Sequence, residues 1–270
     1  MVQMNDDMTQ WPSSLCPRWP GLQVVVLEST DSTNNWMQQH RDLVQRGPVL
    51  VVADSQTAGR GSGTNHWESA AGCNLTFSLQ VYPTALPARR MWALSEAMSL
   101  AVCLGLEQVT AQHGGADDGV FAIKWPNDVY HVDGKVCGML IENELQTRLV
   151  ERSVMGVGIN VNQTSFVSDA PNPRSLAQVT GCSVSRLQVL STVLSCAADC
   201  YKLVEQSDYD RLHALYLSRV YRWQEWHSYV DAGGTYEGRI TDVCPDGHLV
   251  ITDCEGRERT YAFGEIKYII

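Results

Sequence analysis

The sequence contains no apolar run that approaches the roughly 18 residues needed to cross a bilayer. Its first residues, MVQMNDDMTQ, are acidic and polar, whereas a secretory signal begins with a basic stretch and continues into an apolar one. These two absences argue against a membrane protein and against a secreted one. We therefore expect a cytoplasmic protein without a membrane partner.

Cysteine pairs at metal-ligand or redox spacing are also missing. The nine cysteines form an odd set with no CxxC pair, and no histidine stands at zinc-ligand spacing. A disulfide framework needs paired cysteines in an oxidising compartment, and a structural zinc site needs four suitably spaced ligands. Scattered thiols in a reducing cytoplasm explain this pattern better, so no metal ligands are predicted.

An excess of positive charge is absent as well. The formal net charge is −10, and no local basic patch interrupts it. Because nucleic acids attract clustered Lys and Arg, this balance opposes a nucleic-acid partner. With 270 residues and 44% hydrophobic content, the chain can form one large core, or a catalytic domain with a small appendage.

The most informative stretch that is present covers residues 124–142 and reads KWPNDVYHVDGKVCGMLIE. An apolar run ends at Lys124, because Pro126 restricts the residue before it to extended geometry. Asp133-Gly134 predicts a two-residue hairpin turn, after which Lys135–Glu142 returns as the partner strand. Two lysines would thus stand at rigid corners, where ammonium groups can bind phosphate or carboxylate oxygens. Ordinary solvated lysines are the alternative.

A glycine-rich segment at residues 54–67, DSQTAGRGSGTNHW, follows the apolar run Val49–Ala53. Gly59, Gly61 and Gly63 let the backbone come close to a ligand, and Arg60 adds a forked cation. The segment lacks the GxxxxGK[ST] pattern of a phosphate-binding P-loop, and no helical pattern follows it. Alone, it is weak evidence for a ligand site.

Together, the two segments resemble the biotin protein ligase family. GRGSGTNHW is similar to the adenylate-binding loop of that family, and KWPNDV followed by GKVCGMLIE is similar to its catalytic lysine motif. Ser32-Thr33-Asn34 and GVGIN at residues 156–160 match two further family signatures in the same order. The resemblance extends over residues 22–270, and KWPND is its most specific part. The loop departs from the common pattern at Ser62, where many members have arginine, and at Thr64-Asn65.

The resemblance implies an α+β fold. It would consist of a mixed β-sheet catalytic domain covered by helices, of the class II aminoacyl-tRNA synthetase-like biotin/lipoate ligase type, plus a small C-terminal SH3-like β-barrel. Residues 1–21 contain three prolines and no periodicity, so they are expected to form an irregular leader, too short for the DNA-binding domain that some members carry there. We expect a catalytic domain at residues 22–223 and the SH3-like domain at residues 224–270, where glycine and proline turns separate short alternating runs.

Periodicity predicts the elements between these motifs. Buried strands are expected at residues 22–28, 49–55 and 72–81, and a glycine-interrupted strand at 148–162. A helix is expected with Ser32-Thr33-Asn34 in its first turn and an apolar face within residues 36–44. Further helices are expected at residues 89–112, 185–206 and 208–223, with Ser185 capping the one at 185–206. A loop is expected at residues 163–182, and the C-terminal strands at 236–243, 248–253 and 258–263.

The activity that the resemblance implies has two steps. Biotin carboxylate attacks the α-phosphate of ATP to give biotinyl-5'-adenylate and pyrophosphate, and a lysine of a biotin carboxyl carrier domain then attacks that anhydride. The first step brings two anions together, so we expect Lys124 to be the cation between them and Arg60 a second one. The implied cofactors are ATP and Mg²⁺, with Mg²⁺ bridging phosphate oxygens. A homodimer is among the expected assemblies.

The resemblance also implies individual contacts. The residues expected to bind biotin are Ser32, Thr33, Asn34, Gln56, Arg60, Gly61, Ser62 and Lys124. The residues expected to bind ATP or the adenylate are Gly59, Arg60, Gly61, Ser62, Trp67, Lys124, Asn127, Lys135, Gly138 and Asn160. Gln56 has a reason of its own, because an amide donates and accepts at once and so complements the cyclic urea of biotin.

Three interpretations stay open at the level of single residues. Ser32-Thr33-Asn34 can simply cap the helix that follows. Trp67 can be a core residue. Strict alternation along a strand puts Lys135 and Gly138 on opposite faces, so both can reach one ligand only through a bulge or an end-on approach.

Two alternative functions also stay open. One is a lipoate or octanoate ligase or transferase of the same fold, against which Gln56 and KWPND argue. The other is a regulator that binds biotin or its adenylate without acylating anything, against which Lys124 and the acidic net charge argue.

Overall fold

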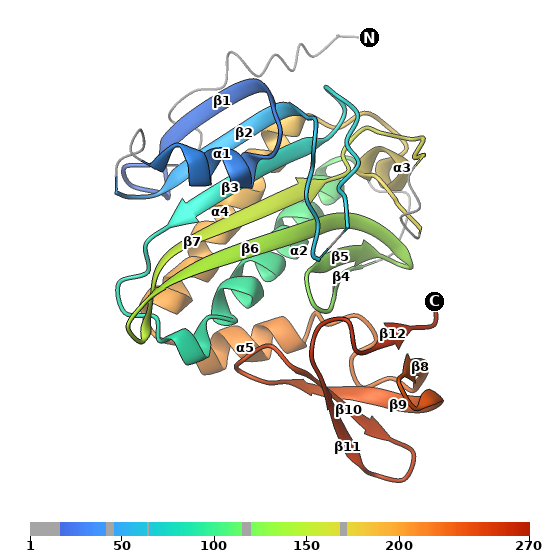
Figure 1. Ribbon diagram of the computed structural model, residues 1–270. Coiled ribbons are helices and arrows are strands. Elements are labelled where there is room, and N and C mark those ends of the chain that lie inside the picture. Colours follow the sequence, from blue (N-terminus) through green and yellow to red (C-terminus); the bar gives the residue numbers. More distant parts are fainter. Residues whose placement is uncertain (1–16, 42–45, 64, 115–119, 168–171) are drawn as a thin grey trace.

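The structure is a computed structural model that describes residues 17–41, 46–63, 65–114, 120–167 and 172–270 (Figure 1). The strands are β1 (Gln23–Thr30), β2 (Val49–Gln56), β3 (Leu75–Val81), β4 (Phe121–Lys124), β5 (Asp128–His131), β6 (Gly134–Gln146), β7 (Leu149–Ile159), β8 (His227–Asp231), β9 (Gly234–Val243), β10 (Leu249–Asp253), β11 (Glu258–Tyr261) and β12 (Lys267–Tyr268). The helices are α1 (Thr33–Gln39), α2 (Ala93–Gln112), α3 (Leu176–Thr180), α4 (Arg186–Glu205) and α5 (Tyr209–Leu217), with a 3₁₀ turn at Ala88–Arg90.

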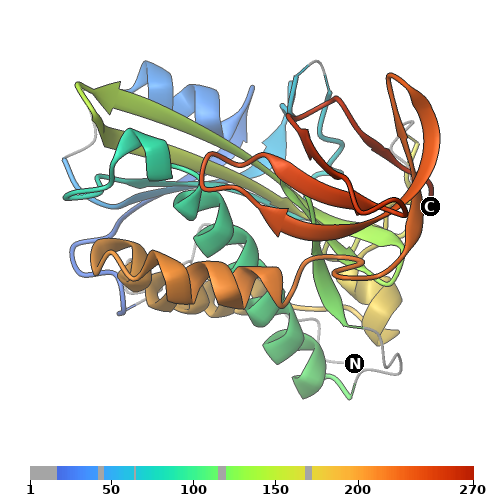
Figure 2. The same ribbon diagram turned by 90° about the horizontal axis from the view of Figure 1, so that it is seen from below.

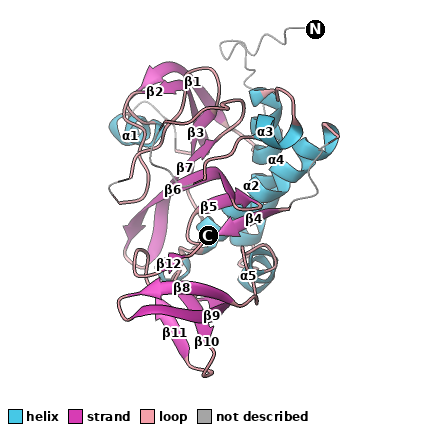
Figure 3. Ribbon diagram, turned by 90° about the vertical axis from the view of Figure 1, so that its right-hand side faces the viewer, coloured by secondary structure: helices cyan, strands magenta, loops and turns pink. Residues whose placement is uncertain are grey.

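The larger layer is a mixed sheet with the strand order β1-β2-β3-β7-β6-β5-β4. β1 and β2 pair in parallel, and the other neighbours pair antiparallel. Helices α2 and α4 cover one face of this sheet, and α1 lies on the other (Figures 1 and 3). All seven residues of β3 are buried, because this central strand is covered on both faces. The predicted α+β fold, a mixed sheet covered by helices, is confirmed.

The main core lies between the sheet and the pair α2 and α4. The two helices approach each other closely at Gly105, where an added Cβ would lie 2.8 Å from Cγ2 of Val193. Helix α4 has the length and apolar content of a membrane span. However, its apolar side, including Val189 and Leu194, belongs to this core, so its hydrophobicity is explained by packing.

Several predicted elements need correction. The strand predicted to be buried at residues 22–28 corresponds to β1, which is only partly buried because it lies at the edge of the sheet. Helix α3 lies inside the predicted loop at residues 163–182; Ser175 and Gln178 form a capping box at its start, a signal that the sequence does contain. Helix α5 ends at Leu217, six residues before the predicted end at residue 223. Leu43 and Val44, placed on the apolar face of the first helix, lie outside the described residues, as does most of the expected leader.

Helix α4 agrees with its prediction. Ser185 is its N-cap, and the side chain of Ser185 accepts a hydrogen bond from the backbone N–H of Gln188. The helix ends at Glu205, one residue before the predicted end. A single capping hydroxyl followed by a continuous apolar face therefore sufficed to predict both ends.

The C-terminal residues form a second, antiparallel sheet with the order β11-β10-β9-β8-β12 (Figure 2). This arrangement is consistent with the predicted SH3-like unit. The sheet contacts the larger layer through Trp125, whose indole Nε1 donates to the carbonyl oxygen of Gly247 at 2.9 Å. Consequently, the chain end and β12 lie beside the β4–β5 hairpin (Figure 3).

His213 of α5 connects helix α2 to the C-terminal sheet. Its Nδ1 lies 2.7 Å from a carboxylate oxygen of Glu96 on α2, and its Nε2 lies 3.1 Å from one of Asp242 on β9. Because both partners are carboxylates, both ring nitrogens donate when the imidazole is protonated. The hydrogen bond to Glu96 raises the pKa of His213, and burial opposes this only in part.

We expect this connection to stabilise the protein more at low pH. A raised pKa means that the stabilisation is complete below the unfolded pKa of about 6.5 and is lost as pH rises through the folded pKa. His213→Gln should therefore lower the free energy of unfolding by about 1 to 3 kcal/mol at pH 6 and by less at pH 9, measured by urea denaturation. His248→Gln, which removes a histidine paired with exposed Asp246, is the control. Equal losses at both pH values would contradict the expectation.

Candidate functional site

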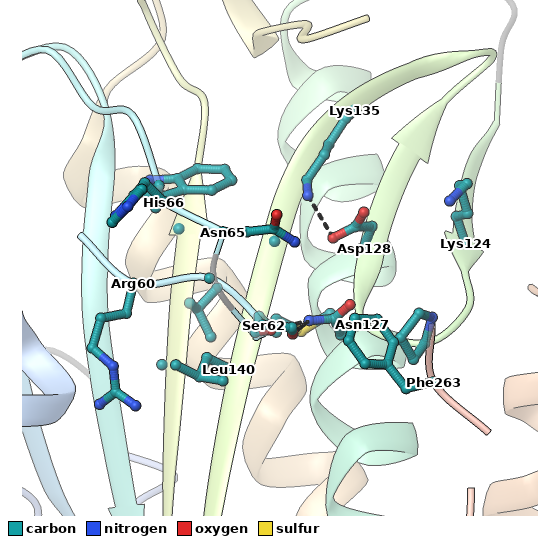
Figure 4. A pocket seen from close by; sticks show the side chains of 18 of the residues that line it. Arg60, Ser62, Asn65, His66, Lys124, Asn127, Asp128, Lys135, Leu140 and Phe263 are labelled. Carbon is teal, nitrogen blue, oxygen red and sulfur yellow. Dashed lines mark hydrogen bonds and ion pairs between the residues drawn. The ribbon is translucent and has the colours of Figure 1, made fainter. Parts of the chain in front are cut away.

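A cavity of about 510 Å³ lies where the glycine-rich loop, the β5–β6 hairpin and the C-terminal sheet meet (Figure 4). Its described lining includes nearly all of the predicted site residues: Ser32, Thr33, Asn34, Gln56, Arg60, Gly61, Ser62, Trp67, Lys124, Asn127, Lys135 and Gly138. The structure thus brings together three segments that are far apart in the sequence. Lys124 and Arg60 line the same cavity.

The KWPND segment forms the corner that was predicted. β4 ends at Lys124, and the chain turns back so that the backbone of Lys124 lies opposite that of Asp128, the first residue of β5. The Trp125–Pro126 peptide bond is cis. The side chain of Asn127 donates to the hydroxyl of Ser62 at 2.7 Å, and also to the carbonyl oxygen of Met139. Asn127 therefore ties the glycine-rich loop to the hairpin.

The hairpin turn is displaced by one residue from its prediction. β5 ends at His131 and β6 begins at Gly134, so the two-residue turn is Val132-Asp133, with Val132 at φ 54°. Gly134 does not adopt a positive φ, so a glycine is needed at this position for another reason. A Cβ there would lie 2.7 Å from the Cβ of Arg174, so the glycine allows another segment to approach closely.

A β-bulge resolves the question of how Lys135 and Gly138 reach one side. Val129 pairs with Cys137 and Tyr130 pairs with Lys135, which leaves one extra residue in β6. The extra residue reverses the alternation, and both Lys135 and Gly138 line the cavity. Of the two explanations left open, the bulge is therefore confirmed.

The two lysines of the motif are partly buried in the cavity wall, so the solvated-surface alternative is wrong. The Lys135 ammonium forms an ion pair with Asp128 at 2.7 Å (Figure 4). The Lys124 ammonium lies over the ring of Tyr268, 4.4 Å from its centroid. Burial lowers the pKa of Lys124, and the neighbouring Asp128 carboxylate opposes that effect. A buried cation of this kind gains from an incoming anion.

The polar end of the cavity is a hydrogen-bonded network at the start of α1. The backbone N–H and the hydroxyl of Thr33 donate to Oε1 of Gln56, at 2.8 and 3.2 Å. The hydroxyl of Ser78 lies 2.6 Å from Oδ1 of Asn34, whose Nδ2 donates to Glu142 at 2.8 Å. Ser78 and Glu142 were not predicted as site residues. These bonds hold the amides of Asn34 and Gln56 in fixed orientations.

Simple capping does not explain the residues at the start of α1. Ser32 occupies the N-cap position, but its side chain makes no capping hydrogen bond. Its backbone N–H donates instead to the carboxylate of Asp31 at 2.7 Å. Ser32, Thr33 and Asn34 are all buried and all line the cavity. The capping interpretation is therefore wrong for this segment.

Arg60 extends from the glycine-rich loop at the opposite end of the cavity from Lys124 (Figure 4). Its guanidinium contacts the carboxylate of Glu142 at 2.8 Å and Oδ1 of Asn35 at 2.8 Å. The loop closes on itself, because Gly61 N–H donates to the carbonyl oxygen of Asn65 at 2.8 Å. Arg60 is thus held next to the Asn34 network by an acidic partner.

Trp67 forms a wall of the cavity, so it is not simply a core residue. A Cβ at Gly158 of β7 would overlap its indole, and a Cβ at Gly138 would lie 3.0 Å from it. Likewise, a Cβ at Gly156 would overlap the side chain of Asn34. The glycines of β7 therefore mark close approach by side chains of the site.

Two predicted contacts do not line the cavity. Gly59 is buried within the loop, where a Cβ would lie 2.5 Å from the carbonyl oxygen of Trp67. Asn160 is buried below β6, and its Nδ2 donates to the carbonyl oxygens of Lys135 and Arg174, at 3.3 and 3.2 Å. Gly59 and Asn160 therefore support the backbone of lining segments and do not face the cavity themselves.

The C-terminal sheet supplies lining residues that were not predicted. They are Phe263, Gly264, Ile266, Lys267, Tyr268 and Ile270. No local pattern marks them, because they are more than 100 residues from the glycine-rich loop and the KWPND corner. The second sheet therefore completes the cavity.

Comparisons with known proteins place this geometry in context. Residues 26–160, half of the chain, match the Biotin/lipoate A/B protein ligase family. The chain is 30% identical to the bifunctional ligase/repressor BirA of Bacillus spizizenii over 229 residues, and 28% identical to the biotin--[acetyl-CoA-carboxylase] ligase of Paracoccus denitrificans over 241 residues. These alignments cover 79% and 86% of this chain, and 64% and 95% of the relatives.

A solved structure has a similar fold. The biotin protein ligase of Aquifex aeolicus in complex with biotin and ATP superposes with a TM-score of 0.73 at 27% identity, covering 92% of this chain and 99% of that one. The matched family region contains α1, the glycine-rich loop, the KWPND corner and the glycines of β7. By this match over half of its length, the chain belongs to the Biotin/lipoate A/B protein ligase family.

Proposed function

We propose that the protein ligates biotin, through biotinyl-5'-adenylate and at the expense of ATP, to a lysine of a biotin carboxyl carrier domain. The observation that carries this proposal is a single cavity with two chemically different ends. One end presents the amides of Asn34 and Gln56, and the other presents Lys124 and Lys135. Biotin has the same division, with a neutral cyclic urea at one end and a carboxylate at the other.

The neutral end fits a urea and a bicyclic ring. Urea recognition needs both donors and acceptors, which the amide and hydroxyl groups of Thr33, Asn34 and Gln56 provide. Next to them, Gly156 and Gly158 let the side chains of Asn34 and Trp67 lie directly against β7. With Leu140 also in the lining, the indole of Trp67 forms one wall of a slot of the kind that holds small apolar ligands.

The cationic end fits the reacting anions. In the first step, a biotin carboxylate oxygen bonds to the α-phosphorus of ATP while the bond to the leaving pyrophosphate breaks. Lys124 would neutralise charge as the two anions approach, and Lys135 can leave Asp128 for a phosphate oxygen. In the second step, an acceptor amine bonds to the acyl carbon, AMP leaves, and the amine releases a proton.

Mg²⁺ is proposed to arrive with the nucleotide as part of the substrate. No group of three or more His, Cys, Asp or Glu in the described part of the chain could hold a metal ion. Asp128 is the one acidic side chain among the described lining residues, and Lys135 already neutralises it. Mg²⁺ commonly keeps several waters and binds through substrate phosphates, so this lining suits it.

The remaining parts of the proposal concern partners and location. Eight cysteines in the described residues are free thiols, which supports a reducing cytoplasm. The net charge of −10 supports an absence of nucleic-acid partners. Self-association into a homodimer belongs to the proposal and is checked by light scattering.

The proposed function is tested by isotope exchange and acceptor labelling. Purified protein with ATP, Mg²⁺ and biotin should exchange labelled pyrophosphate into ATP, and it should transfer labelled biotin to a biotin carboxyl carrier domain. Exchange that depends on lipoate or octanoate instead of biotin would identify the related ligase. Tight biotin binding without exchange would identify a non-catalytic sensor.

A further inference from the structure

The Lys124 ammonium differs in its partners from Lys135 and Arg60, two other cations of the cavity. Lys135 is paired with Asp128, and Arg60 is paired with Glu142. Among the described residues, Lys124 makes no ion pair or hydrogen bond; its ammonium lies over two aromatic rings instead. The distances to the ring centroids are 4.4 Å for Tyr268 and 5.4 Å for Tyr130.

Both rings are within the range of a cation–π interaction, which extends to about 6 Å. An aromatic face stabilises a positive charge without accepting a conventional hydrogen bond. The three N–H donors of Lys124 therefore remain available for substrate oxygens. A carboxylate in the same place would neutralise the charge and compete with biotin and the α-phosphate for those donors.

Tyr268 is held in place by the C-terminal sheet. It lies on β12 and pairs with Tyr229 of β8. Its ring packs edge-on against Tyr229 with the centroids 5.3 Å apart, and it lies 6.4 Å from the ring of Tyr221. Its hydroxyl is buried and has no hydrogen-bond partner, so the useful part of this side chain is its ring.

We propose that Tyr268 is a positioning residue for the reaction: its ring, together with that of Tyr130, holds the Lys124 ammonium where the carboxylate and the α-phosphate meet. This inference rests on the proposed function. It gives the C-terminal sheet a defined role, because β12 supplies one of the two faces that hold the cation. Tyr268 acts through Lys124 and need not touch the reacting atoms.

The test compares four proteins: the wild type, Tyr268→Leu, Tyr268→Phe and Tyr236→Leu. Leucine keeps apolar bulk but removes the ring face, whereas phenylalanine keeps the face and removes only the unpaired hydroxyl. Tyr236 packs against Tyr229 and is not part of the described cavity lining, so Tyr236→Leu reports on general loosening of the sheet. If Tyr268→Leu does not fold, Tyr268→Met replaces it.

In the pyrophosphate exchange assay, Tyr268→Leu should lower kcat by roughly 3- to 30-fold, the range of one cation–π contact. The KM for biotin should change little, because the lost interaction acts on the charge that develops during the reaction. Tyr268→Phe should recover most of the rate. A wild-type kcat in Tyr268→Leu, or an equal loss in Tyr268→Phe, would overturn the inference.

A second readout needs no activity, because the chain has only four lysines: Lys124, Lys135, Lys202 and Lys267. Each ε-carbon can be labelled with ¹³C, assigned by single Lys→Arg variants and titrated by NMR. Lys124 should lose its proton at lower pH in Tyr268→Leu than in the wild type. It should titrate as in the wild type in Tyr268→Phe and Tyr236→Leu.

The other charges that act on Lys124 are unchanged in these variants. They are Asp128 on β5, Lys135 on β6 and Arg222 before β8, and Lys267 of β12 lines the same cavity. An unaltered Lys124 titration in Tyr268→Leu would overturn the role of Tyr268 but leave the proposed function standing. A wild type without biotin-dependent exchange would instead overturn the proposed function, and the two failures are therefore distinguishable.

Discussion

Lys124→Ala is expected to lower the rate of biotin-dependent pyrophosphate exchange by about 100- to 1,000-fold, the usual effect of removing one preorganised donor to a developing charge. Lys124 is half-buried at the end of β4 and faces the cavity. Burial lowers its pKa, so the ammonium is poorly solvated before substrate arrives and has much to gain from two anions. The loss should appear in the exchange step itself.

The matched control for this prediction is Lys202→Ala. Lys202 lies in the last turn of α4 and is not part of the described cavity lining. Its removal should leave exchange unchanged. If Lys124→Ala exchanged pyrophosphate at the wild-type rate while remaining folded, the cation between carboxylate and phosphate would have to be another residue.

Arg60→Ala is the second variant with a large expected effect, again about 100- to 1,000-fold in exchange if the guanidinium moves from the Asn34 end of the cavity and donates to the transferring phosphate. In the structure, Arg60 is bound to Glu142 at 2.8 Å and to Asn35 at 2.8 Å. To act on a substrate, the guanidinium must exchange this carboxylate for an anion in the cavity. Arg60→Lys should recover only part of the rate, because an ammonium lacks the planar fork.

Two controls separate charge from loop structure. Arg41→Ala removes an exposed arginine paired with Glu144 and should not affect exchange. Glu142→Gln keeps the shape of the carboxylate partner but removes its charge, so Arg60 becomes easier to recruit. If Arg60→Ala kept full activity, the loop arginine would have only the structural role that its pairing with Glu142 describes.

The parts of the site that the sequence predicted are those with strong local signals. Pro126 fixed the end of β4 at Lys124, and the Ser185 cap predicted the start of α4. The turn predicted at Asp133-Gly134 was wrong by one residue, because a glycine can either adopt a turn conformation or leave room for a neighbouring segment. Here Gly134 allows Arg174 to approach and does not supply a turn conformation.

The parts that could not be predicted depend on contacts between distant segments. Tyr268 reaches Lys124 from 144 positions further along the chain, and Ser78 reaches Asn34 from the middle of a strand. Neither residue stands in a recognisable pattern. Lys135 and Gly138 were recognised by type, but their common side depends on a bulge that alternation alone does not specify.

That bulge makes the length of the β5–β6 hairpin as important as its composition. If β6 paired with β5 without this bulge, regular alternation would put Lys135 and Gly138 on opposite faces, even though every recognisable motif residue would still be present. The one residue by which β6 exceeds β5 between these two pairs therefore decides which side of the hairpin Lys135 occupies.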